Sequence, residues 1–148
     1  MKTLPNEIFF AEVEQLLSEG RDVVITVQGN SMRPFILNGR TRAVLAACDP
    51  TTLTEGDVVL FRYRGRHVLH RIVERHGDDL VLAGDGNYRQ QERCRTQDVA
   101  ARMKAVISAG GRTTDCDSRL WRWSSAVWLR LPAIVRRAVV SLMRRAGF

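Results

Sequence analysis

The chain has 148 residues, which is enough for one domain with its own hydrophobic core. Its formal net charge is +7, but residues 1–111 hold 15 Lys/Arg against 14 Asp/Glu, whereas residues 112–148 hold 8 Arg against 2 Asp. The basic character therefore belongs to the C-terminal part, and the charge of the whole protein is no argument for nucleic-acid binding.

The sequence predicts neither a membrane-spanning helix nor a secretory signal. No run of about 18 uncharged apolar residues is present. With no export signal, we expect the protein in the cytoplasm, with its basic tail available for peripheral association with the inner membrane surface. A secretory signal is excluded because acidic residues interrupt the apolar positions of the first segment. They are Glu7, Glu12, Glu14 and Glu19.

The three cysteines, Cys48, Cys94 and Cys116, are odd in number and form no CxxC pair. This pattern predicts neither a disulfide framework nor a metal site, and it fits a reduced compartment. We expect no metal and no cofactor.

Hydrophobic periodicity predicts a mainly β protein. Residues 5–19 have apolar residues at helical spacing and Gly20 as a stop, which indicates an N-terminal helix. Short runs rich in β-branched residues follow, separated by Gly- and Asn-containing turns, as in a compact antiparallel sheet or partial barrel. The RYRGRHV segment predicts a hairpin tip with Gly65 in the turn. The predicted strands are 22–28, 42–48, 57–64, 67–75, 79–84 and 100–108.

Residues 112–148 form a basic tail with two predicted amphipathic helices, the second beginning at Pro132. We therefore divide the chain into a catalytic domain (1–111) and this tail. One interpretation is an in-plane anchor, in which residues 118–146 bind an anionic membrane surface through arginines and tryptophans. The other is that the apolar stripes pack on the sheet or on a second copy. Binding of an acidic leader peptide or of nucleic acid is less favoured. The tryptophans are Trp121, Trp123 and Trp128.

A serine in the segment VQGNSMRPF raises the question of catalysis, because Ser31 follows a strand directly. Such a serine usually stabilises a turn, and it acts as a nucleophile only with a base beside it. Three further motifs follow in order: GDVVLF at 56–61, HRIV at 70–73 and GDGN at 84–87. Together with GNSMRP they resemble the signal peptidase I and LexA-type protease superfamily over residues 22–108. The resemblance implies a compact β fold and serine peptidase activity.

The superfamily uses either a lysine or a histidine as the base. The only lysines here are Lys2 and Lys104, neither in the expected strand, whereas His70 occupies the histidine-type motif. A histidine side chain titrates near pH ~6.5 and can accept a serine proton at neutral pH, whereas a lysine near ~10.4 needs strong desolvation. We therefore expect Ser31 as nucleophile and His70 as base. By resemblance, Asp85 of the GDGN turn is the third group.

The neighbours of the serine complete the predicted site. We expect the Ser31 amide as an oxyanion-hole donor, freed by the turn at Gly29, with Met32 and Pro34 near the substrate. Many signal peptidases have a serine at the position of Gly29, so the second donor is unidentified. His67 is three residues from His70 and should face the other side of the sheet. The alternative interpretations are a turn role for Ser31 and Asp85 and a packing role for His70.

The sequence thus favours a serine endopeptidase that removes leader or signal segments from peptides or proteins. No membrane helix precedes Ser31, which suits a dedicated maturation peptidase better than a membrane-bound signal peptidase. The alternatives are a catalytically inactive peptide-binding module and a basic protein associated with membrane or nucleic acid; the near-neutral β region disfavours nucleic acid.

Overall fold

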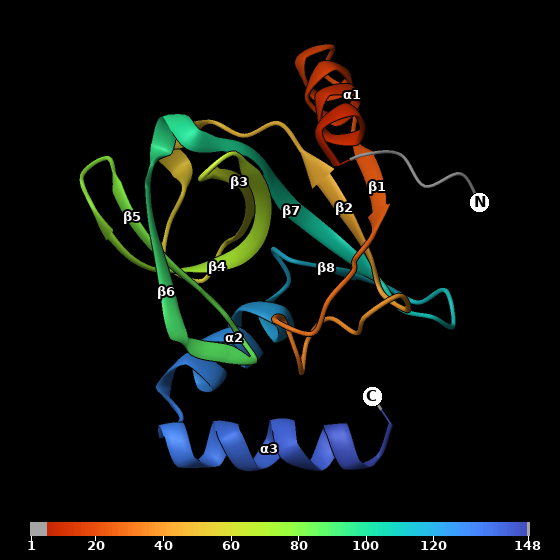
Figure 1. The fold of residues 1–148 in the computed structure, drawn as a ribbon, viewed down its shortest axis with the longest axis vertical. Coiled ribbons are helices and arrows are strands. Elements are labelled where there is room, and N and C mark those ends of the chain that lie inside the picture. The colour runs from red at the N-terminus through yellow and green to blue at the C-terminus, as the bar shows by residue number, and fades with distance from the viewer. Residues whose placement is uncertain (1–5, 148) are drawn as a thin grey trace.

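The computed structural model describes residues 6–147, which form a strongly curled antiparallel sheet with one helix before it and two after it (Figure 1). Two short 3-10 helices, Pro50–Thr52 and Thr96–Asp98, connect strands. The α-helices are α1 (Asn6–Ser18), α2 (Arg119–Arg130) and α3 (Ala133–Arg145). The strands are β1 (Val23–Thr26), β2 (Arg42–Ala46), β3 (Val58–Tyr63), β4 (Arg66–His76), β5 (Asp79–Gly84), β6 (Asn87–Arg95), β7 (Val99–Ile107) and β8 (Thr113–Asp115).

The sheet confirms the predicted mainly β, antiparallel fold. Its strand order is β1-β2-β7-β3-β4-β5-β6, with β8 also paired to β7. The register shifts within four strand pairs, β2–β7, β3–β7, β4–β5 and β5–β6. Such irregularities bend strands and increase their twist, which allows β3 to β6 to curl round instead of forming a flat layer.

The predicted hairpin tip lies between β3 and β4. Tyr63 pairs with Arg66, and the two residues between them, Arg64 and Gly65, have φ of 50° and 77°. A two-residue turn with both central residues in the left-handed region matches the right-handed twist of the flanking strands. The hairpin fixes the register of β4, the strand that carries His70.

Two hydrophobic cores support the fold, one on each side of the bend. The smaller core fills the curl of β3 to β6, and the larger lies between α1, β1, β2 and β7 and extends under the loop after β1. Met32 and Ile36 of that loop are 2% and 0% exposed in the larger core. The loop that carries Ser31 is therefore held from below by apolar contacts.

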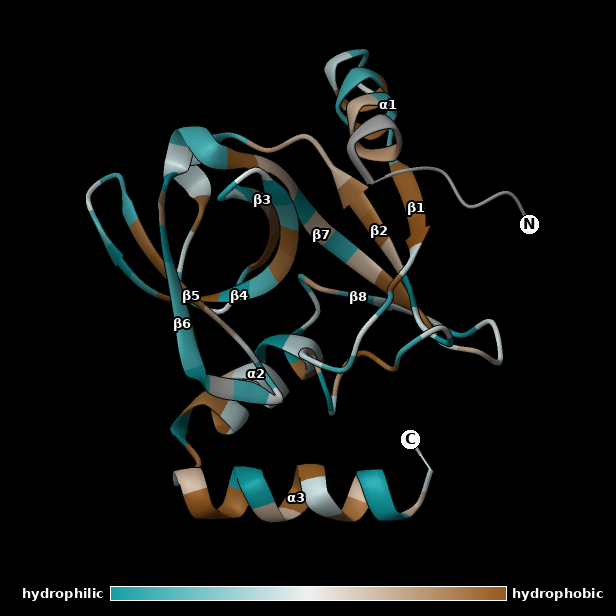
Figure 2. Ribbon diagram, viewed as in Figure 1, coloured by the Kyte–Doolittle hydropathy of each residue, from teal (hydrophilic) through white to brown (hydrophobic). Residues whose placement is uncertain are grey.

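The sequence pattern predicted neither β6 nor the short strand β8, which lies in the expected helical tail. β6 is the longer of the two. Its sequence NYRQQERCR has no apolar alternation, and Figure 2 shows it as largely hydrophilic. It pairs only with β5 and so forms an edge of the sheet, where most of its side chains meet solvent. An edge strand needs fewer apolar residues, so its periodicity is weak.

The tail begins inside the sheet. β8 pairs with β7, and the expected boundary at residue 111 lies in the turn that joins these two strands. α2 then packs on the body, with Trp121, Ser125 and Trp128 buried, while Trp123 is 66% exposed. No described residue of α3 is buried. None of the helices in residues 6–147 combines the length and apolar character that a membrane crossing requires.

Candidate active site

The loop after β1 presents Ser31 above the larger core. The backbone N–H of Gly29 donates to Asn38 Oδ1 at 2.8 Å, and the N–H of Gly39 donates to the carbonyl of Val27 at 2.8 Å. These bonds tie the two ends of the loop together. Gly29 has a φ of 91°, in the left-handed region that favours glycine, so the turn before Ser31 depends on this residue type.

Ser31 and His70 meet in the structure although 39 residues separate them. Ser31 Oγ lies 3.1 Å from His70 Nε2, within hydrogen-bond distance. His70 is buried in the middle of β4, where it pairs across to Val59 of β3. The sequence analysis predicted this pairing, and the geometry allows the hydroxyl to donate its proton to a neutral Nε2.

The GDGN turn packs directly against the serine loop. The N–H of Gly86 donates to the carbonyl of Ser31 at 2.8 Å. A Cβ on Gly84 would lie 2.4 Å from that carbonyl oxygen and 3.1 Å from His70 Nε2. The approach of these backbones leaves no room for a side chain at residue 84, so glycine at this position sets the distance between serine and histidine.

Asp85 does not face His70. Its two carboxylate oxygens accept hydrogen bonds from Nε and Nη2 of Arg71 at 2.8 and 2.7 Å, and both side chains are buried. Arg71 Nη1 also donates to Ser125 Oγ of α2 at 2.7 Å, and Trp128 Nε1 donates to the carbonyl of Asp85 at 3.1 Å. Asp85 thus joins the turn to β4 and α2, and it does not hold the position that the resemblance implied for it.

Glu92 occupies that position instead. Its Oε1 lies 3.1 Å from His70 Nδ1, and both side chains are less than 10% exposed. The contact is within ion-pair distance but does not meet hydrogen-bond geometry, and within the described residues neither His70 Nδ1 nor Glu92 Oε2 has a hydrogen-bond partner. Glu92 could not be predicted as a site residue from hydrophobic periodicity, because it lies on β6, a strand without apolar alternation. One sequence signal could have indicated Glu92. It is an acidic residue that follows the GDGN motif, and the strand that leaves this turn runs antiparallel to the strand that enters it.

The residues around the serine differ in their availability to a substrate. Met32 is 2% exposed and packs in the core, so it supports the loop from beneath. Pro34 is half-buried, and the N–H of Gly29 is already used by Asn38. The Ser31 amide donates no hydrogen bond within the described part of the chain, which leaves it available as an oxyanion donor.

The competing bases lie elsewhere. Lys104 pairs with Asp22 and is about half exposed, while Lys2 lies outside the described residues. His67 stacks on Phe10 of α1 with ring centroids 4.5 Å apart, so it is half-buried under the helix instead of facing solvent. Lys104 and His67 do not contact Ser31 in the described structure.

A second ionic cluster fixes the start of α2. Hydrogen bonds from Arg102 and Arg122 lower the pKa of Asp117, and Arg122 also donates to the buried Asp57 at 2.8 Å. Burial raises the pKa of the nearby Cys116 thiol to about 12. The thiol is therefore un-ionised at neutral pH.

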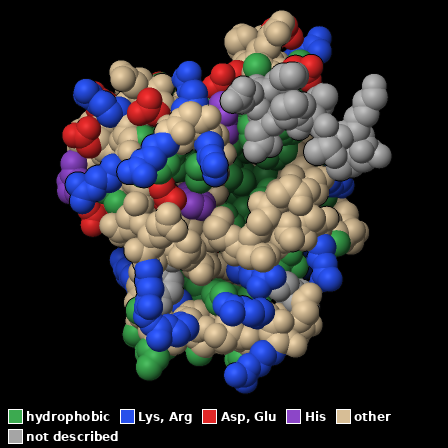
Figure 3. Space-filling model, in the orientation of Figure 1, with side chains coloured by type: hydrophobic (Ala, Val, Ile, Leu, Met, Phe, Trp, Pro, Cys, Tyr) green, Lys and Arg blue, Asp and Glu red, His purple; other side chains and the backbone are tan. Residues whose placement is uncertain are grey.

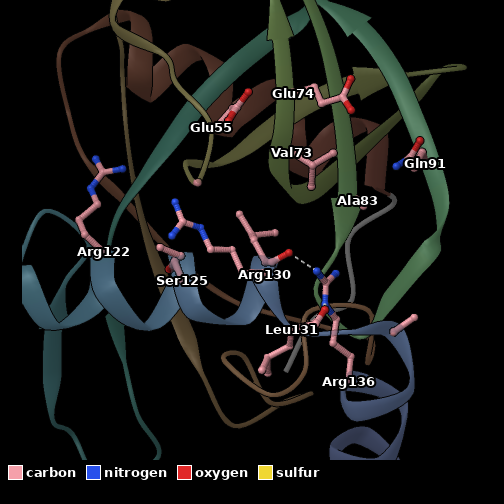
Figure 4. A pocket seen from close by; sticks show the side chains of 14 residues that line it. Glu55, Val73, Glu74, Ala83, Gln91, Arg122, Ser125, Arg130, Leu131 and Arg136 are labelled. Carbon is pink, nitrogen blue, oxygen red and sulfur yellow. Dashed lines mark hydrogen bonds between the residues drawn. The ribbon is translucent and has the colours of Figure 1, made fainter.

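A cavity of about 590 Å³ lies between α2 and the strands (Figure 4). Val73, Ala83 and Gln91 line it from the sheet, and Ser125 and Arg130 line it from α2. Neither Ser31 nor His70 is part of this lining. We therefore do not place the reacting bond there, although the cavity is large.

Taken together, the contacts define a class of site. A serine hydroxyl beside an imidazole, which in turn faces a buried carboxylate, is the arrangement that serine hydrolases use for acyl transfer. A family model described as Peptidase S24-like matches residues 3–106, more than two thirds of the chain. The chain belongs to this family. No curated protein matches the sequence significantly.

Proposed function

We propose that the protein is a serine endopeptidase in which Ser31 is the nucleophile, His70 the general base and Glu92 the group that orients the imidazole. The observation that carries the proposal is the chain of two 3.1 Å contacts from Ser31 Oγ through the ring of His70 to Glu92 Oε1. Membership of a peptidase-like family supports it.

In the proposed reaction, Ser31 Oγ attacks the carbonyl carbon of a peptide bond while its proton passes to His70 Nε2. The imidazolium then delivers this proton to the leaving amine, which departs and leaves an acyl-enzyme. Water, deprotonated by the same nitrogen, releases the acyl group. Glu92 faces Nδ1 and would keep the proton on that nitrogen, so that Nε2 is free to accept. The Ser31 amide would donate to the oxyanion.

Asp85 has a different role in this proposal. Because both of its oxygens accept from Arg71, we assign it to holding the GDGN turn against β4. Arg71 further contacts α2 through Ser125 and lies 4.9 Å over the ring of Phe35. The first helix of the tail thus supports the site from behind, so α2 belongs to the catalytic unit.

The proposed substrates are peptides or small proteins that carry a leader or signal segment. The resemblance to signal peptidases and LexA-type proteases supports this choice, and it favours small residues before the cut. The rival function is a peptide-binding module without turnover, which would use the same residues around Ser31 only to hold a peptide.

Digestion of a diverse peptide library, analysed by mass spectrometry, tests the proposal. Ser18→Ala is a matched control, because Ser18 lies at the exposed end of α1 and its hydroxyl bonds no described residue besides Gln15, whose carbonyl accepts from it. We expect cuts by the wild type and Ser18→Ala, and none by Ser31→Ala or His70→Ala. Cuts that persist in Ser31→Ala would contradict the mechanism. Peptide binding without cuts would favour the binding module.

A further inference from the structure

Two hollows line the seam between α3 and the loops that build the site. The first, of about 150 Å³, lies between the GDGN turn and α3, and the second, of about 370 Å³, lies between the serine loop and the end of α3. Arg144 lines both hollows, so we treat the two as one feature. We call it the basic seam, and its arginines are Arg33, Arg40, Arg89, Arg137 and Arg144.

The described lining of the basic seam contains no carboxylate side chain. Neither hollow has an Asp or Glu in its lining, and within the described residues Arg89, Arg137 and Arg144 form no ion pair. Arg71, Arg102 and Arg122, by contrast, each pair with an aspartate. Arginines gathered around a concave surface without carboxylates create a positive potential that favours an anion.

A buried donor in the seam points to a ligand as well. Arg33 Nε is buried and has no hydrogen-bond partner within the described part of the chain. A buried guanidinium nitrogen without an acceptor is costly, and an anionic ligand would satisfy it. Arg33 belongs to the serine loop, two residues after Ser31.

The seam also lies next to the proposed nucleophile. Gly86 lines the first hollow, and its N–H donates to the carbonyl of Ser31 at 2.8 Å. A Cβ at Gly86 would lie 3.1 Å from the carbonyl oxygens of Asn30 and Arg33, so the turn and the serine loop are in contact there. Figure 3 shows Lys and Arg side chains gathered along the hollow between α3 and the body of the protein. A peptide bound at Ser31 would pass close to these side chains.

We propose that the basic seam binds a carboxylate side chain of the peptide substrate, so that the enzyme selects segments with Asp or Glu within a few residues of the cleaved bond. The inference rests on the proposed peptidase function. Guanidinium groups match carboxylates with paired hydrogen bonds, which gives both affinity and direction. A bilayer would instead meet Ile134 and Leu142, which are 75% and 64% exposed on α3 and line neither hollow.

Binding is tested on Ser31→Ala protein, so that cutting does not interfere. The probes are two fluorescent eight-residue peptides, one alternating Glu with Ala and the other alternating Gln with Ala, followed by anisotropy. The test variant is Arg144→Gln; the matched control is Arg145→Gln, one residue further along the same helix and outside both hollows. Thermal unfolding checks that both variants fold.

We expect the Glu peptide to bind at least tenfold more tightly than the Gln peptide and to lose affinity with added salt. Arg144→Gln should weaken its binding about tenfold and Arg145→Gln less than twofold. Equal binding of the two peptides, or equal losses in the two variants, would overturn the proposal. Arg144-dependent binding of phosphatidylserine vesicles or single-stranded DNA, with no binding of the Glu peptide, would also overturn it, in favour of lipid or nucleic acid.

The library digestion separates this inference from the proposed function. Cuts enriched in Asp or Glu at one fixed position, with the enrichment lost in Arg144→Gln, support both. Cuts without acidic preference, together with no binding of the Glu peptide, would support the peptidase function and overturn the proposed role of the basic seam. Arg144-dependent binding of the Glu peptide without any cut would support the carboxylate site in the basic seam and contradict the proposed peptidase activity.

Discussion

Replacing Gly84 with alanine should separate serine from histidine. The new Cβ would lie 2.4 Å from the Ser31 carbonyl oxygen, where ordinary contact begins near 3.4 Å, so the two backbones must part by about 1 Å. A misplacement of about 1 Å at a catalytic group costs about 100-fold in rate. The same crowding should lower the free energy of unfolding by about 1–3 kcal/mol, the usual cost of overpacking.

The assay is the turnover of a peptide from the library digestion, measured beside thermal unfolding. Gly110→Ala is the matched control, because a Cβ at Gly110 would meet no heavy atom within 4 Å and its φ is not positive. We expect Gly84→Ala to lose about 100-fold in kcat while remaining folded, and Gly110→Ala to keep its activity. Full turnover by folded Gly84→Ala would refute the argument that this close approach sets the geometry of the pair.

Three other changes probe the carboxylates and a buried thiol. Glu92→Gln should lower kcat about 10²- to 10⁴-fold with little change in melting temperature, and Glu92→Asp should recover part of the lost kcat. Kinetics and calorimetry measure the two quantities. An unchanged kcat would exclude Glu92 as the orienting group. Asp85→Asn should instead lower the free energy of unfolding by about 3–5 kcal/mol, because it leaves the buried Arg71 without a carboxylate. Unchanged stability in chemical denaturation would contradict the role given to Asp85. Burial raises the pKa of Cys116 from 9.0 to about 12, so the wild type should lose stability as the pH rises from about 9 towards 12, where only the unfolded thiol ionises. Cys116→Ala should lose less over that range, and an identical pH dependence would contradict the assigned pKa.

The sequence could predict the parts of the site that carry strong local signals. Ser31 follows a strand and a glycine turn, and His70 lies in the HRIV motif, so the resemblance carried by these motifs could place both residues. The hairpin at Arg64 and Gly65 was predictable because the turn chemistry is local. These elements needed no knowledge of distant contacts.

The third member of the site could not be predicted in the same way. Glu92 lies on an edge strand with polar residues on both sides, and its approach to His70 depends on how β4, β5 and β6 pair. Asp85 sits in a recognisable motif, but its neighbour Arg71 takes both carboxylate oxygens. Tertiary packing decides which carboxylate faces the imidazole, and the periodicity of the sequence does not predict this choice.

The packing of α2 against the site could not be predicted from the sequence either. The three tryptophans of this helix fitted a membrane interface as well as a protein core, since an amphipathic pattern does not identify the surface that it packs against. The structure buries the indoles of Trp121 and Trp128 against Phe35 of the serine loop, with ring centroids 5.3 and 6.2 Å apart, while Trp123 stays exposed. The anchor interpretation therefore loses Trp121 and Trp128 and retains the exposed Leu120, Trp123 and Val127 of α2 and the exposed residues of α3 as contacts for a membrane.

The most direct test of the central claim is labelling of Ser31 by a fluorophosphonate, because the reagent modifies activated serine hydroxyls and requires no knowledge of the substrate. Intact-protein and peptide mass spectrometry would locate the adduct. The account predicts one adduct, on Ser31, that forms at least 100-fold more slowly in His70→Ala and is absent from Ser31→Ala. An unlabelled wild type, or equal labelling of the wild type and His70→Ala, would contradict the claim that His70 activates Ser31.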